Sequence, residues 1–146
     1  MSVVYVNESN LKAVVDLSLL LFPEETFSEL FKIYQECLTS EKERVFLYQK
    51  DNQYVGYLHL AIRSDYVNGT NTSPVVFVEA IYVLPKYQRH GIGREFIKFA
   101  ESFAKTRNIK QIASDCFIDN VQSVKFHKNC GFIEKERVIC FVKDIK

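Results

Sequence analysis

The chain has 146 residues, of which 47% are hydrophobic and 25% are charged. This length fits one domain spanning residues 1–146, and the apolar fraction excludes an intrinsically disordered chain. The net charge of +1 without long like-charged runs argues against a nucleic-acid partner, and the longest apolar run, residues 17–22, is too short to cross a membrane.

Hydrophobic periodicity and turn residues predict ten elements in the order β-α-α-β-β-β-α-β-α-β. Asn10 is expected to cap the first helix, which Pro23 ends, and the segment from Thr26 to Glu29 fits a capping box for the second. The expected strands cover residues 3–6, 45–49, 54–62, 75–84, 109–114 and 132–142, and the expected helices residues 11–22, 27–38, about four turns after Gly93, and 119–129. A three-strand meander followed by two crossovers predicts an α/β (α+β) domain, a mixed sheet flanked by helices.

A glycine-bearing basic loop follows the strand 75–84 and leads into an amphipathic helix. A helix N-terminus exposes unpaired N–H groups and binds anions, while Gly91 and Gly93 allow a close backbone approach. A dinucleotide site fits poorly because Phe96 stands where a third glycine is required, and no Gly-Lys-Ser/Thr sequence supports a P-loop. On the glycines alone, an ordinary strand-to-helix turn is almost as good an interpretation.

Two motifs together resemble the GNAT superfamily of N-acetyltransferases: Gln88-x-x-Gly91-x-Gly93, and Asn120-x-x-Ser123-x-x-Phe126-His127-x-x-x-Gly131-Phe132. The resemblance implies the GNAT fold and acetyl-CoA as co-substrate. It implies that the strand end splays from its neighbour, leaving backbone groups of Tyr82 and Val83 free for the pantetheine arm. The implied cofactor-binding residues are Ile81, Tyr82, Val83, Gln88, Arg89, His90, Gly91, Ile92, Gly93, Arg94, Asn120 and His127.

The reaction implied is direct attack of a neutral amine on the thioester, which depends above all on proximity. Glu79, a carboxylate within an otherwise apolar strand, is the candidate base. His127 stands where this superfamily often has a tyrosine that protonates the departing thiolate. A histidine can donate that proton, although a packed or solvent-facing histidine is an equally good interpretation.

The segments 62–75 and 79–85 further resemble the aminoglycoside 6′-N-acetyltransferases, which implies acetylation of an aminosugar antibiotic and hence resistance to it. Such a polycation needs a carboxylate-rich site, for which we expect Glu79, Asp115 and Asp119, with Tyr66 against a sugar ring. Residues 1–79 hold six Lys/Arg against eleven Asp/Glu and residues 80–146 thirteen against seven, so the two halves would suit ligands of opposite sign. On charge alone, chance scatter over a solvated surface is as good an interpretation. Asp119 could instead cap its helix, with Gln122 completing a capping box, and Tyr66 could anchor its loop.

The alternatives are an acetyltransferase for a polyamine, an amino acid or a protein N-terminus, and a non-catalytic acyl-CoA sensor. The four cysteines lack CxxC spacing, so no metal is expected, and scattered thiols without an export signal favour the cytoplasm. No membrane partner is expected. The apolar residues 138–142 favour a homodimer.

Overall fold

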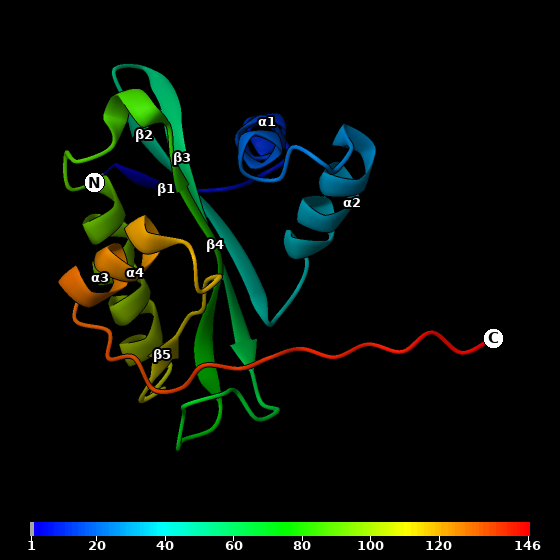
Figure 1. The fold of residues 1–146 in the computed structure, drawn as a ribbon. Helices are drawn as coiled ribbons and strands as arrows, with labels where there is room; N and C mark the ends of the chain where they lie inside the picture. Colours follow the sequence, from blue (N-terminus) through cyan, green and yellow to red (C-terminus); the bar gives the residue numbers. More distant parts are fainter. Residues whose placement is uncertain (1) are drawn as a thin grey trace.

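The computed structural model describes residues 2–146. Its five strands form one sheet in the order β1-β2-β3-β4-β5, with helices on both faces (Figure 1). The elements are β1 (Val3–Tyr5), α1 (Leu11–Leu21), α2 (Phe27–Cys37), β2 (Glu43–Lys50), β3 (Gln53–Arg63), β4 (Val75–Val83), the 3-10 turn η1 (Pro85–Tyr87), α3 (Ile92–Thr106), β5 (Ile112–Ala113) and α4 (Val121–Asn129). The predicted mixed sheet flanked by helices is confirmed.

The first four strands form an antiparallel meander, and β5 returns parallel to β4. Asp51 and Asn52 join β2 to β3 with φ angles of 52° and 61°, the left-handed backbone that a tight hairpin turn requires. The crossover from β4 through α3 to β5 brings the N-terminus of α3 to the end of β4. This placement forms the strand-to-helix turn on which the candidate site is built.

The sheet separates two hydrophobic cores (Figure 1). On one face α3 packs Phe96 and Phe103 against β2 and β3, and Phe46 meets Phe103 edge-on at 6.0 Å between ring centroids. On the other face α1 and α2 bury a hydrogen-bonded cluster, in which the hydroxyls of Tyr34 and Tyr57 lie 3.2 Å apart. Burying each large side chain stabilises the fold by about 1.5–3 kcal/mol, so both faces hold the sheet in place.

Two of the predicted helix caps differ from those in the structure. Thr26 caps α2 as predicted, since its hydroxyl accepts the Glu29 N–H at 3.2 Å. Asn10 precedes α1, but its side chain does not cap the helix. Its side-chain oxygen Oδ1 accepts the N–H of Asn7 instead. The cap of α4 is Asn120, which accepts the N–H of Ser123 at 3.1 Å, so the alternative of an Asp119 cap was wrong.

The predicted last strand, residues 132–142, does not form. Residues up to 136 stay against the body, where the Phe132 ring contacts that of His127 and Glu136 reaches Tyr66. Beyond them the chain extends away from the sheet (Figure 1). A strand needs a hydrogen-bonding partner, and within residues 2–146 that segment pairs with none. Its large apolar side chains are therefore exposed: Val138, Ile139, Phe141, Val142 and Ile145.

None of the helices in residues 2–146 is both long and apolar enough to span a lipid bilayer.

Candidate active site

The turn between β4 and α3 has the geometry of an anion site. Arg89 and Gly91 both have positive φ, 65° and 85°, which turns the backbone sharply into the helix. Gly91 is the N-cap of α3, and no side chain caps this end. The first-turn N–H groups therefore remain available to a ligand, at the positive end of the helix dipole. A Cβ placed on Gly91 would meet no atom within 4 Å, so the space beside this N-cap is open.

The side chain of Gln88 holds the turn in place. Its amide donates to the Val83 carbonyl at 2.8 Å, tying the loop to the end of β4. The Val83 carbonyl therefore already accepts one hydrogen bond, while the Val83 N–H is not used by Gln88. Gln88 fixes the loop, while the exposed Arg89, His90 and Arg94 surround its open side.

Gly93 also has a packing role that its local sequence does not indicate. A Cβ at this position would lie 2.7 Å from the ring of Phe126, well inside van der Waals contact. Glycine here lets α4 pack against the first turn of α3. The loop consequently holds one glycine that faces open space, Gly91, and one that joins two helices.

The sheet opens beside the second half of β4. β5 pairs only with Val76 and Phe77, so the strand from Glu79 to Val83 has no ladder partner on that side within residues 2–146. Backbone groups directed toward this gap are free of strand pairing, apart from the Val83 carbonyl that Gln88 occupies. An extended ligand arm could add to this edge as a strand would.

The carboxylate of Glu79 is held by an arginine. Nε and Nη2 of Arg63 donate to the same Glu79 oxygen at 2.9 and 2.6 Å, and the guanidinium lies 3.7 Å from the centre of the Phe77 ring. Both partners are partly exposed, so solvent and ligands reach the pair. A cationic ligand at Glu79 must compete with this guanidinium.

His127 belongs to α4, and both nitrogens of its ring are hydrogen-bonded. Nδ1 is 2.7 Å from the carbonyl oxygen of Ser123, which can only accept, so Nδ1 carries a proton. In the neutral ring Nε2 then accepts from the Ser114 hydroxyl, 2.7 Å away. Both ring nitrogens of His127 are thus hydrogen-bonded within the protein. The side-chain oxygen Oδ1 of Asn120 accepts the cap hydrogen bond of α4. The side-chain NH₂ group of Asn120 is not used by this cap.

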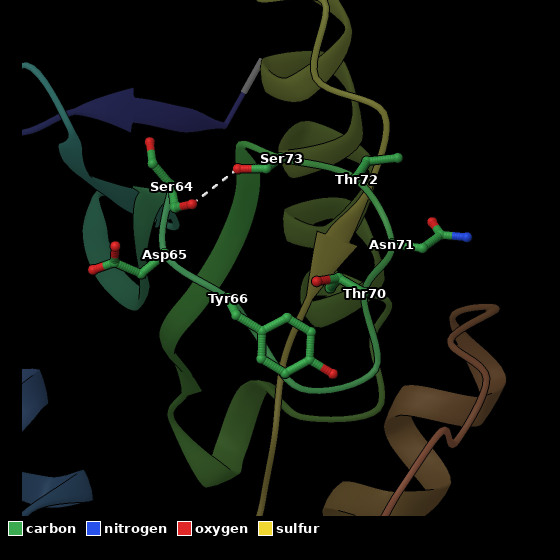
Figure 2. Close-up of a pocket in the computed structure, with 7 residues that line it drawn as sticks. All are labelled: Ser64, Asp65, Tyr66, Thr70, Asn71, Thr72 and Ser73. Atoms are coloured by element: carbon green, nitrogen blue, oxygen red, sulfur yellow. Dashed lines mark hydrogen bonds between the residues drawn. The ribbon is translucent and has the colours of Figure 1, made fainter.

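The predicted acceptor residues lie on exposed segments. Asp115 and Asp119 belong to the segment after β5, and Tyr66 is 75% exposed on the loop between β3 and β4. This loop lines a hollow of about 380 Å³. Figure 2 shows the loop with the Tyr66 ring inside its curve and Ser73 hydrogen-bonded to Ser64. The hollow has no residue in common with the turn before α3.

Comparison with known proteins places the chain in a family. The model of the acetyltransferase (GNAT) family matches residues 11–132. The chain belongs to this family. An aminoglycoside N(6′)-acetyltransferase type 1 of Acinetobacter baumannii is 37% identical over 145 residues, 99% of each chain, and one of Acinetobacter haemolyticus is 40% identical over 140 residues, 95% of each. The solved structure of AAC(6')-Iy, in complex with the bisubstrate analogue CoA-S-monomethyl-acetylneamine, superposes with a TM-score of 0.94 at 31% identity, covering 98% of this chain and 97% of that one.

The resemblance to the GNAT superfamily is thus confirmed, and so are its fold and its class, an acetyltransferase. Two residues of this acetyltransferase escaped the sequence reasoning. Arg63 lies sixteen positions from Glu79, and only the register of β3 on β4 brings them together. Ser114 directly follows β5, and no local pattern marks its contact with His127. Each of these contacts joins residues of different elements, and the periodicity of a single element cannot predict such a contact.

Proposed function

We propose that this acetyltransferase moves the acetyl group of acetyl-CoA to the 6′-amine of aminoglycoside antibiotics, by direct attack in a ternary complex. The observation that carries the proposal is the full-length likeness to AAC(6')-Iy bound to an analogue that joins CoA to acetylneamine. A site that accepts both halves of such an analogue holds donor and acceptor together, which supports direct transfer. Proximity then supplies most of the acceleration, and the transfer needs no metal.

In this proposal the pyrophosphate of acetyl-CoA lies at the N-cap Gly91, on the N–H groups of the first turn of α3. Arg89 and Arg94 add positive charge at its side. The pantetheine arm follows the unpaired edge of β4 at Ile81 and Tyr82, and the amide of Asn120 donates to it. A backbone N–H near Val83 polarises the thioester carbonyl.

The amine side is built on Glu79. One ammonium group of the antibiotic displaces Arg63 from the carboxylate, which then anchors the substrate or takes the amine proton. Asp115 and Asp119 attract further ammonium groups, because neither carboxylate has an ion-pair partner among residues 2–146. Tyr66, exposed on the loop between β3 and β4 (Figure 2), stacks on a sugar ring.

The departing thiolate receives its proton through a short relay. A protonated His127 donates from Nε2 to the Ser114 oxygen, and the Ser114 hydroxyl passes its own proton to the sulfur. The contact from Nδ1 to the Ser123 carbonyl keeps the ring oriented throughout.

We further propose a homodimer formed through the C-terminal tail, residues 137–146. Phe141 is 88% exposed, and Val142 is exposed to a similar extent. An extended apolar segment of this kind favours pairing with another strand. A second copy supplies such a partner at the open side of its short β5. The four free thiols, none in a disulfide, favour a reducing compartment, and we place the enzyme in the cytoplasm.

Thiol release from acetyl-CoA tests the catalytic proposal, with kanamycin, tobramycin, spermidine and a short peptide offered in parallel. The expected result is turnover with the two antibiotics alone. Turnover confined to spermidine or the peptide would keep the family chemistry and reject the antibiotic substrate. Binding of acetyl-CoA without any turnover would favour the sensor alternative.

Analytical ultracentrifugation tests the dimer. The wild-type chain should sediment as a dimer and Phe141→Glu as a monomer, while Ile33→Glu, a control at an exposed apolar position on α2, should stay dimeric. A wild-type monomer at micromolar concentration would contradict the proposal.

A further inference from the structure

Three side chains of different chemistry converge on the face of the sheet that α1 and α2 cover. Cys37 is the last residue of α2, Glu43 the first of β2, and His59 lies within β3. Nε2 of His59 is 2.9 Å from Oε1 of Glu43 and 3.7 Å from Sγ of Cys37. The thiol, the imidazole nitrogen and the carboxylate oxygen all lie within 4.8 Å of one another.

A single nitrogen faces two partners with opposite demands. If Nε2 carries a proton it donates to Glu43, and the thiol loses its acceptor. If Nε2 has a free lone pair it can accept from the thiol, but that lone pair then faces the carboxylate oxygens. A neutral imidazole can therefore form a favourable hydrogen bond through Nε2 with only one of the two, the carboxylate or the thiol. A cation at the same point would accept a lone pair from all three.

The spacing suits a small tetrahedral ion. Zn²⁺ binds nitrogen and oxygen at about 2.0–2.1 Å and sulfur at about 2.3 Å, which separates nitrogen from sulfur by about 3.6 Å and nitrogen from oxygen by about 3.4 Å. The observed nitrogen–sulfur distance of 3.7 Å already matches. The nitrogen–oxygen distance of 2.9 Å must widen by about 0.5 Å, and the Glu43 side chain, 43% exposed, has the freedom to move.

A reactive thiol is the other chemistry that a cysteine–histidine pair offers, and the structure disfavours it. Cys37 is 4% exposed, so an external substrate cannot reach its sulfur. Reactive cysteines of enzymes are partly exposed, whereas this one is buried.

We propose that Cys37, Glu43 and His59 form a binding site for a divalent borderline cation, of which Zn²⁺ fits best. Thiolate, imidazole and carboxylate together select zinc over the hard cations Mg²⁺ and Ca²⁺, which prefer oxygen ligands. The exposed side of Glu43 gives the entry path and leaves the fourth position to water. The ion would tie the C-terminal end of α2 to β2 and β3, so its role is to stabilise the helical layer on the sheet.

Cobalt spectroscopy tests the site independently of acetyl transfer. Tag-free protein in which the exposed Cys116 and Cys140 are replaced by serine receives one equivalent of Co²⁺. A sulfur-to-cobalt charge-transfer band and the visible bands of tetrahedral cobalt are expected, and Zn²⁺ should remove both. Cys37→Ser in this background should abolish the charge-transfer band, whereas Cys130→Ser, a control at a partly buried thiol, should keep it.

Glu43→Gln keeps the test decisive if Cys37→Ser does not fold, since Glu43 is half-exposed. Its Co²⁺ affinity should fall by at least about 10–100-fold, the loss typical of removing even an outer-shell partner. Zn²⁺ should also raise the melting temperature of the parent protein and leave that of Glu43→Gln unchanged. No charge-transfer band in the parent protein, a band that survives Cys37→Ser, or an unaltered affinity in Glu43→Gln would overturn the proposal.

Discussion

Replacing Gly91 by alanine should separate cofactor binding from folding, and Gly131→Ala is its matched control. The two glycines have φ angles of 85° and 89°, and a Cβ on either would meet no atom within 4 Å. A left-handed backbone costs a non-glycine residue about 1–2 kcal/mol, so the two variants should lose similar free energies of unfolding. Denaturant unfolding of both variants checks this equality.

The two methyl groups differ in their surroundings. The one at Gly91 enters the open space at the N-cap of α3, where we place the pyrophosphate, while Gly131 lies just beyond α4. The dissociation constant of acetyl-CoA, measured by titration calorimetry, should rise at least about tenfold in Gly91→Ala, or about 1.4 kcal/mol, and stay near wild type in Gly131→Ala. Equal acetyl-CoA affinity in folded Gly91→Ala and wild type would refute the assignment of the loop.

Three further predictions concern the amine, the proton relay and the buried tyrosines. Arg63→Gln should lower the KM for aminoglycoside, because the guanidinium no longer competes for Glu79; a raised KM would show that Arg63 instead assists binding. Ser114→Ala should lower kcat by about 10²-fold with little change in acetyl-CoA affinity, because His127 loses its path to the sulfur; an unchanged kcat would exclude the relay. Burial raises the pKa of Tyr57. Above pH 10 the folded chain therefore keeps a proton on this hydroxyl that the unfolded chain loses. In that pH range the free energy of unfolding should fall by about 1.4 kcal/mol per pH unit. Tyr57→Phe should reduce this dependence of unfolding free energy on pH, measured by denaturant titrations between pH 9 and 11. Equal slopes for Tyr57→Phe and wild type would show that Tyr57 is not the group responsible.

The parts of the site that local sequence determines were predictable. Gly91, the basic loop and the amphipathic pattern of α3 are contiguous, and a turn entering a helix leaves N–H groups free wherever it occurs. Thr26 and Glu29 lie three residues apart, so their cap needed no knowledge of the rest of the fold. The spacing of turns and strands likewise predicted the meander, because each hairpin is local.

The parts of the site that depend on contacts between distant segments could not be predicted from the sequence. Gly93 is needed because Phe126 packs on it, and nothing near Gly93 in the sequence indicates α4. Arg63 reaches Glu79 through strand register, which a shift of one residue would destroy. The apolar tail shows the same limit, since residues 132–142 have the composition of a strand but pair with no other segment among the described residues.

The proposed reaction is tested most directly by two antibiotics that differ at a single group. Neomycin has an amine at the 6′ position, and paromomycin has a hydroxyl there. Thiol release from acetyl-CoA should be rapid with neomycin and absent with paromomycin, and mass spectrometry with NMR should place one acetyl group on the neomycin 6′ nitrogen. Equal rates with the two, or an acetyl group on any other amine, would contradict 6′-N-acetylation.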